Sequence, residues 1–233
     1  MTHKEYCERV ENAKNIVFFG GAGVSTESGI PDFRGVDGLY NQKYDVSPEE
    51  ILSADYFYAH TDRFYRFYFD KMICTSAAPN AAHKKLAQWE RDGKLSAVVT
   101  QNIDGLHRAA GSKRVFELHG TTLDNHCTRC GRYFSLADVL AQKPNVPRCG
   151  CGGVIKPDVV LYGEILPEAE VDGAIDAISR ADMLIVGGTS LGVYPAAGLV
   201  RYYRGAAENL VLINLTRISG FENQLNGKIG ELL

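Results

Sequence analysis

The sequence predicts an α/β fold built on a parallel sheet with helices on both faces. Along its 233 residues, short apolar runs alternate with helical patterns, which is typical of parallel strands joined by crossover helices. Each run is too continuously apolar for a half-exposed strand, so both faces of the sheet should be covered. The expected strands are Ile16–Phe19, Ala97–Thr100, Val115–Leu118, Met183–Val186, Leu210–Ile213 and a short strand near Leu225.

Three helices are expected around this sheet. The first lies near the start of the chain, with Tyr6, Val10 and Ala13 on its inward face. A second is predicted over Asn80–Arg91, where Pro79 suits a first turn and Gly93 follows as a C-terminal stop. A third is predicted over Glu168–Arg180, with Val171, Ile175 and Ile178 on one apolar stripe.

Two segments interrupt the alternation and predict a second, smaller domain. Residues 36–78 are rich in aromatic residues at helical spacing, and residues 120–165 contain four cysteines. A cleft between this module and the sheet would be the default ligand site. The expected division is a large domain of residues 1–35, 79–119 and 166–233, with residues 36–78 and 120–165 forming the small domain.

The charge and hydropathy of the chain argue against two kinds of partner, nucleic acids and membranes. A net charge of −3 gives no electrostatic footprint for nucleic acid or an anionic membrane surface. No apolar run approaches the roughly 20 residues of a membrane span, and the first residues lack a signal-peptide pattern. We therefore expect a cytoplasmic, monomeric protein with no direct nucleic-acid or membrane partner.

Four of the six cysteines indicate a structural zinc site. Cys127 and Cys130 form one pair, Cys149 and Cys151 a second, and residues 131–148 separate the two pairs. In a reducing compartment this spacing favours a closed, tetrahedral four-thiolate zinc site over disulfides.

We expect no metal to be bound by the histidine next to this cluster or by the other two cysteines. His126 could replace one sulfur, but four thiolates make it unnecessary. Cys7 and Cys74 lie far from the cluster in sequence, and we expect small, partly buried thiols without a special role.

The run GGAGVSTESGIPDFRG at residues 20–35 predicts a phosphate-binding loop. It follows a strand and contains Gly-x-Gly, so its backbone amides could gather around a diphosphate. The dinucleotide fingerprint is incomplete because Thr26 stands at the third glycine position, and a plain turn is the alternative. Phe33 and Arg34 favour a ligand site, since an aromatic plane can cover a reactive sugar carbon and an arginine can pair with phosphate.

Two further motifs follow predicted strands. In TQNIDGLH (residues 100–107), Asp104 could accept from a carboxamide nitrogen while Ile103 packs on the ring; the alternative is a helix-capping turn. In ELHG (residues 117–120), His119 is placed as a general base, although a lone histidine is more often structural. Three ligand-like motifs at one sheet edge favour the functional interpretation.

The chain resembles the sirtuins, the NAD-dependent protein deacylases, and most of all their small bacterial members. The motifs GAGVSTESGIPDFRG, TQNIDGLH, ELHG, the cysteine pairs, KPDVVLYGE, GGTSLGVYPAAGL and INL occur in the family's order. The resemblance implies a Rossmann-like large domain, a small domain of zinc ribbon and helical insertion, and one structural zinc ion. It also implies lysine deacetylase or deacylase activity on acyl-lysine proteins or peptides, with NAD consumed and nicotinamide and O-acyl-ADP-ribose released.

The resemblance assigns roles residue by residue. The catalytic residues would be His119, Asn102 and Asp104. The NAD contacts would be Ala22, Thr26, Ile30, Phe33, Arg34, Gln101, Asn102, Ile103, Asp104, Thr189, Ser190, Asn214 and Ile229. The zinc ligands would be Cys127, Cys130, Cys149 and Cys151. The acyl-lysine peptide would contact Val160, Tyr162, Gly163 and Glu164.

One departure from the family bears on the acyl group. Branches that remove succinyl or malonyl groups resemble Tyr-x-x-Arg where this chain has Tyr65 and Tyr68, so apolar acyl groups should be preferred. Two other functions compete. An ADP-ribosyltransferase is disfavoured because His119 is present, and a non-catalytic NAD-sensing scaffold is disfavoured because the polar positions are intact.

Overall fold

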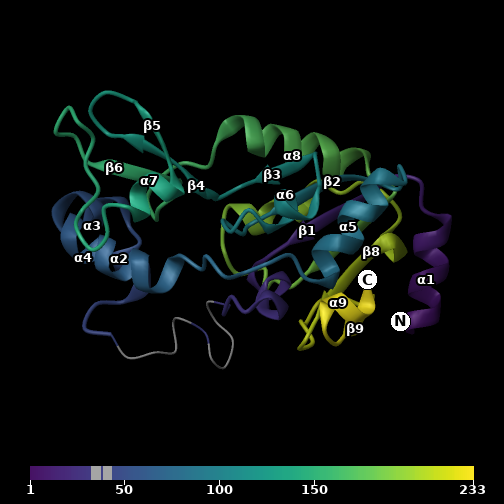
Figure 1. Ribbon diagram of the computed structural model, residues 1–233. Helices are drawn as coiled ribbons and strands as arrows, with labels where there is room; N and C mark the ends of the chain where they lie inside the picture. The colour runs from purple at the N-terminus through teal and green to yellow at the C-terminus, as the bar shows by residue number, and fades with distance from the viewer. Residues whose placement is uncertain (33–37, 39–43) are drawn as a thin grey trace.

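The computed structural model describes residues 1–32, 38 and 44–233, and its main feature is a parallel sheet (Figure 1). Within these residues the sheet has six strands in the order β3-β2-β1-β7-β8-β9. This order confirms the Rossmann-like prediction, and it reverses direction between β1 and β7, where such folds bind ligands. The strands are β1 (Ile16–Gly20), β2 (Leu95–Thr100), β3 (Val115–Glu117), β7 (Met183–Gly187), β8 (Leu210–Asn214) and β9 (Gln224–Asn226).

Helices cover both faces of the sheet, as expected. Alternate side chains of β1 point to opposite faces. Ile16 and Phe18 pack in one buried cluster with α1 (His3–Asn12), α5 (Ala81–Arg91) and α9 (Ile229–Leu232). Val17 and Phe19 pack in another, with α8 (Glu168–Arg180) and the 3₁₀ segment η5 (Ala196–Tyr202).

Asn80 begins α5 and also ties that helix to the loop that follows β1. Its side-chain oxygen accepts the backbone N–H groups of Ala82 and His83, which makes it the N-cap rather than the first helical residue. Its Nδ2 donates to the carbonyl of Val24 and to the Ser28 hydroxyl. The loop comprises two short 3₁₀ turns, η1 (Ala22–Val24) and η2 (Thr26–Ser28), which are thereby fixed over the sheet edge.

A smaller body lies to the left of the sheet in Figure 1. We call it the small lobe, and it consists of described residues 44–78 and 120–165. Its aromatic core includes Phe57, Phe64 and Tyr65. The domain boundaries expected from the sequence remain a prediction. The small lobe contains α2 (Pro48–Ile51), α3 (Ala54–Ala59), α4 (Thr61–Phe67), the π-helical η4 (Tyr68–Met72), β4 (Gly120–Cys127), β5 (Tyr133–Ser135), α7 (Leu136–Leu140) and β6 (Ile155–Val159).

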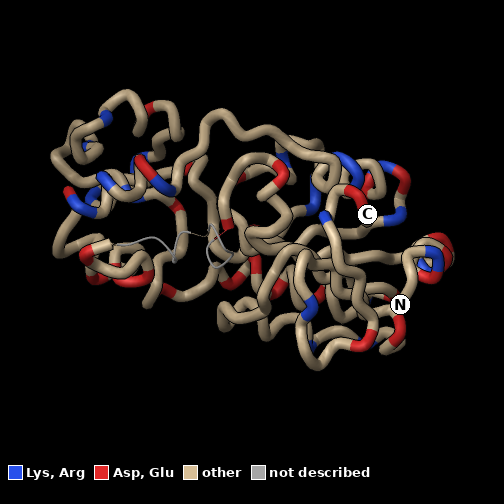
Figure 2. Tube along the Cα trace, turned by 90° about the horizontal axis from the view of Figure 1, so that it is seen from below, with Lys and Arg blue, Asp and Glu red and all other residues tan. Residues whose placement is uncertain are grey.

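Surface features complete the description. Acidic and basic residues are interspersed at both ends of the trace in Figure 2, in keeping with the small net charge. Across the described ranges, every helix is too short or too polar to cross a bilayer.

The expectation of partly buried thiols at Cys7 and Cys74 is wrong, because both residues are exposed. Cys7 lies on the outward face of α1, and Cys74 lies in the loop after η4.

Two histidines are buried beside the loop and the sheet. His83 in α5 and His107 in α6 (Leu106–Ala110) have ring centroids 4.6 Å apart. Both nitrogens of His107 and Nε2 of His83 have no protein partner. Burial lowers the pKa of His107 to about 3 and that of His83 to about 4, so both rings are neutral at pH 7.

This burial predicts acid-sensitive stability. The unfolded chain takes up protons on both rings below pH about 6.5, whereas the folded protein does so only near the lowered pKa values. The stabilisation is therefore complete above pH 6.5 and is lost as the pH falls. Between pH 7 and pH 5 each buried histidine should cost about 2 kcal/mol of unfolding free energy. Urea unfolding at the two pH values measures this loss of unfolding free energy. The loss should be about 2 kcal/mol smaller in His107→Phe than in wild type, whereas His60→Phe, which replaces an exposed histidine, should lose as much as wild type. An equal loss in wild type and His107→Phe would contradict the prediction.

Candidate active site

A cavity of about 790 Å³ lies between the carboxyl edge of the sheet and the small lobe. Every predicted NAD or peptide contact within the described residues lies on its wall, whereas Phe33 and Arg34 lie outside the described residues. The predicted residues on the wall are Ala22, Thr26, Ile30, Gln101, Asn102, Ile103, Asp104, His119, Val160, Tyr162, Gly163, Glu164, Thr189, Ser190, Asn214 and Ile229.

The glycine-rich loop packs directly on the end of β7. The N–H of Gly21 donates to the Gly187 carbonyl at 3.1 Å, and the N–H of Gly23 donates to the Gly188 carbonyl at 2.8 Å. A Cβ at Gly23 would lie 2.8 Å from Gly188 Cα, so only glycine permits this approach. These two amides are therefore used within the protein, contrary to the expectation that they would cradle a diphosphate.

Ser25, which sequence reasoning missed, joins two of the predicted catalytic residues. Its hydroxyl donates to Asp104 Oδ2 at 2.6 Å and accepts from Asn102 Nδ2 at 3.0 Å. Asp104 Oδ1 accepts the N–H of Leu106, so the carboxylate also caps α6. The capping interpretation of TQNIDGLH is thus confirmed, and carboxamide binding by Asp104 stays a prediction. The available signal was the run of hydroxyl residues after the glycines, but sequence alone does not say which of them turns inward.

His119 has a defined tautomer. Its Nδ1 lies 2.9 Å from the carbonyl oxygen of Gln101. A carbonyl only accepts, so Nδ1 carries the proton and Nε2 keeps its lone pair. Burial lowers the pKa of His119, and the hydrogen bond to Gln101 partly opposes that shift. The imidazole is therefore a neutral base at pH 7.

Asn214 holds the loop after β7 in place. Its Oδ1 accepts the Thr189 N–H at 3.0 Å, and its Nδ2 donates to the Thr189 carbonyl at 2.9 Å. Thr189 Oγ1 accepts from Gln101 Nε2 at 3.1 Å, which connects the ends of β7 and β2. The loops after β2, β7 and β8 are thus joined by side chains that also face the cavity.

The segment after β6 forms the opposite wall. The Val160 N–H donates to the carbonyl of His119 at 2.9 Å. The Tyr162 N–H donates to Leu52, and the Tyr162 carbonyl accepts from Ala54, both in the small lobe. These bonds fix Val160 and Tyr162 on the cavity wall next to His119, and the chain then turns at Gly163, where the Glu164 N–H donates to the Leu161 carbonyl.

Comparison with known proteins gives the family. The model of the Sir2 family matches residues 21–195, more than half of the chain. The chain belongs to the Sir2 family. It is 53% identical to an NAD-dependent protein deacetylase of Clostridium perfringens (strain 13 / Type A), covering 97% of this chain and 94% of that one. It is 52% identical to the same-named protein of Clostridium acetobutylicum, covering 96% and 93%.

Solved Sir2 structures agree with this sirtuin in fold. One, with a deacetylated p53 peptide and 3′-O-acetyl ADP ribose, superimposes with a TM-score of 0.89 at 40% identity, covering 99% of this chain and 95% of that chain. Another, with a p53 peptide and NAD⁺, gives a TM-score of 0.86 at 39% identity, with the same coverage.

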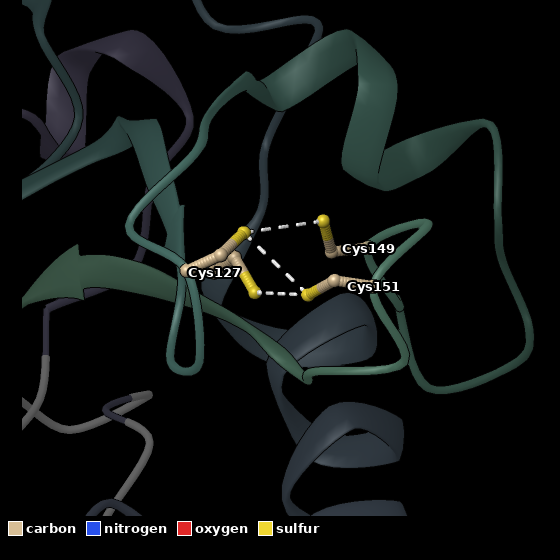
Figure 3. A group of neighbouring side chains, drawn as sticks. Cys127, Cys149 and Cys151 are labelled. Atoms are coloured by element: carbon tan, nitrogen blue, oxygen red, sulfur yellow. Dashed lines mark hydrogen bonds between the residues drawn. The ribbon is translucent and has the colours of Figure 1, made fainter.

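The cysteines of this sirtuin come together as the spacing predicted (Figure 3). All four sulfur atoms lie within 4.8 Å of one another. Cys127 and Cys151 are 3.5 Å apart and Cys130 and Cys149 are 3.7 Å apart, close to the edge of a tetrahedron around Zn²⁺ with bonds of about 2.3 Å. His126 is not a ligand, because its Nδ1 contacts the Asp158 carboxylate at 2.8 Å.

Removing a cluster thiolate should release the metal. We expect purified protein to contain equimolar zinc and Cys130→Ser to retain less than about a tenth of it, with reduced thermal stability. Atomic absorption and calorimetry measure both quantities. Cys74→Ser, which removes an exposed thiol outside the cluster, is the matched control and should keep its zinc. Full zinc content in Cys130→Ser would contradict the assignment.

Removing the Ser25 hydroxyl should slow the enzyme. Ser25→Ala leaves a part-buried carboxylate oxygen and a buried amide without the hydroxyl that joins them, at a cost of about 1–3 kcal/mol. If that cost falls on the transition state, kcat/KM drops roughly 10- to 100-fold. Ser179→Ala removes a hydroxyl bonded to a carbonyl within α8 and should change little. Steady-state kinetics decide, and an unchanged Ser25→Ala enzyme would refute the link.

Proposed function

We propose that this sirtuin is a protein-lysine deacylase that transfers the acyl group of an acyl-lysine to the ADP-ribose part of NAD. Water would be consumed, and nicotinamide, the deacylated lysine side chain and O-acyl-ADP-ribose would be the products. The observation that carries the proposal is the convergence of His119, the Ser25-linked Asn102 and Asp104, and the segment of residues 160–164 on one cavity. Relatives about half identical in sequence are named NAD-dependent protein deacetylases.

In the first step, the acyl oxygen of the lysine side chain replaces nicotinamide at C1′ of its ribose. The proposed role of Asp104 is to accept a hydrogen bond from the carboxamide of nicotinamide, with Ile103 packed on the ring. Ser25 and the Leu106 amide fix the carboxylate for that contact. Asn102, held by Ser25, orders the ribose and a nearby water molecule.

His119 acts in the second step. Its unprotonated Nε2 takes a proton from the ribose, so that the ribose oxygen can attack the acyl carbon. Water then releases the lysine with the acyl group left on ADP-ribose. The defined tautomer supports this role, because Gln101 occupies Nδ1 and leaves Nε2 available.

Further contacts of NAD and peptide follow from the cavity wall. We assign the adenosine half to Thr189, Ser190, Asn214 and Ile229, and the rest of the dinucleotide to Ala22, Thr26, Ile30 and Gln101. The peptide would extend along Val160, Tyr162, Gly163 and Glu164. These assignments, the domain division, a monomeric state and a cytoplasmic location are proposals. The tight set of four sulfurs supports a structural zinc.

The cavity wall favours apolar acyl groups over succinyl and malonyl. Tyr65 and Tyr68, at the positions of the carboxylate-reading pair, are both 1% exposed in the core of the small lobe. The hydroxyl of Tyr65 donates to the Ile155 carbonyl, so it is engaged away from the cavity. Apolar side chains line the cavity on this side, among them Leu52, Met72 and Ile73. Lys71 also lines it, with its ammonium 3.1 Å from the Asp70 carboxylate.

An acyl-peptide series tests this proposal. Peptides of one sequence carrying acetyl-, butyryl-, myristoyl- or succinyl-lysine would be compared at fixed NAD, with O-acyl-ADP-ribose measured by mass spectrometry. We expect kcat/KM for succinyl to be at least about tenfold below that for acetyl, since an unpaired carboxylate must be desolvated. Faster desuccinylation would overturn the acyl preference but not the deacylase assignment.

The His119→Ala variant separates the deacylase from its rivals. Loss of the base should reduce O-acyl-ADP-ribose formation by at least about 100-fold. A protein carrying ADP-ribose as the main product would instead indicate a transferase. NAD binding without any nicotinamide release in the wild type would indicate a sensing scaffold.

A further inference from the structure

One side chain, Glu27, joins the C-terminal helix to the loop after β1. Glu27 lies in η2, next to Thr26 on the cavity wall. Its Oε2 accepts the backbone N–H of Gly230 at 2.9 Å. Gly230 is the second residue of α9, and the first amides of a helix have no partner inside the helix. The carboxylate therefore satisfies a free donor and faces the positive end of the helix.

Gly230 is shaped for this contact. A Cβ built on it would lie 3.0 Å and 3.2 Å from the two Glu27 oxygens and 3.2 Å from Ala81 Cβ at the start of α5. Any side chain at this position would push the carboxylate or α5 away. The contact thus depends on both residues, the acid in η2 and the missing side chain in α9.

Ile229, the neighbour of Gly230, links the Glu27–Gly230 contact to the cavity. It is 4% exposed within the protein core and also lines the cavity, as Gly188, Thr189 and Asn214 do. On its far side, α9 is held by His3, whose Nε2 donates to the Leu232 carbonyl at 3.3 Å. Figure 1 shows α9 beside α5, with the chain ends near each other.

We propose that Glu27 is a positioning residue for the dinucleotide, acting through Ile229 and the η2 turn. This rests on the proposed function, which assigns the adenosine half to this end of the cavity. A four-residue helix is too short to be stable by itself, so its place depends on such contacts. With the Glu27–Gly230 bond present, two walls of the adenosine end are fixed before the ligand arrives. Without it, the ligand must order them and binds more weakly.

Binding measurements on zinc-loaded full-length protein test this. Isothermal calorimetry would give the Kd of ADP-ribose and, separately, of an acetyl-lysine peptide. Glu27→Ala should raise the Kd of ADP-ribose about fivefold and leave the peptide Kd within about twofold. Glu27→Gln keeps an acceptor oxygen and should stay within about twofold of wild type for both ligands. Glu231→Ala removes an exposed acid from the same helix and should match wild type.

Kinetics and a second variant make the outcome decisive. Glu27→Ala should raise KM for NAD with kcat nearly unchanged, and Gly230→Ala should produce the same pattern from the other side of the contact. The positioning role is overturned if Glu27→Ala binds ADP-ribose like Glu231→Ala. It is also overturned if both ligands weaken in parallel with thermal stability, which would indicate a merely structural residue. A wild-type protein that binds no ADP-ribose would overturn the proposed function and this inference with it.

Discussion

The site depends on a contact between two glycine-containing backbones at the point where the strand order reverses. Gly23 and Gly188 approach so closely that a Cβ on either would collide with the other segment, at 2.8 Å or less. Gly188 also has a φ of +61°, which side chains rarely adopt. This contact sets η1 and η2 directly over the end of β7. Ser25 and Glu27 reach Asp104 and Gly230 only because the loop lies there.

From this contact, hydrogen bonds spread across the carboxyl edge of the sheet. Ser25 reaches Asp104 after β2, Gln101 reaches Thr189 after β7, and Thr189 is clasped by Asn214 at the end of β8. Each bond joins loops that are far apart in the sequence, and each residue also faces the cavity. Polar side chains so fixed lose little freedom when a ligand binds, which favours tight recognition.

Structure could be predicted from the sequence where a residue type has one common structural role, such as apolar residues in a buried strand or paired cysteines at a metal site. Continuous apolar runs placed all the strands of the sheet within a residue or two, and the cysteine spacing found the metal cluster. The sequence did not predict the role of a residue where that role depends on a hydrogen-bond partner far along the chain. The amides of Gly21 and Gly23 bind carbonyls of the β7 end, which only the strand order brings near them. Ser25 and Glu27 act through residues distant along the chain, so no local pattern marks them. Asn80 is found locally as a helix start, but its bond to the Val24 carbonyl is not.

The cysteine cluster is connected to the cavity wall through β4 and β6. Cys127 pairs with Ile155 at the start of β6, and the Cys149 N–H donates to the Gly153 carbonyl just before it. β6 then leads into Val160, whose N–H donates to the carbonyl of His119. A metal that fixes the four sulfurs therefore fixes the register of the wall beside His119, the proposed general base. Because that wall also hydrogen-bonds Leu52 and Ala54, the aromatic core of the small lobe and the metal cluster position the same short segment. This wall segment is thus held from three sides, although the four cysteines themselves lie outside the cavity lining.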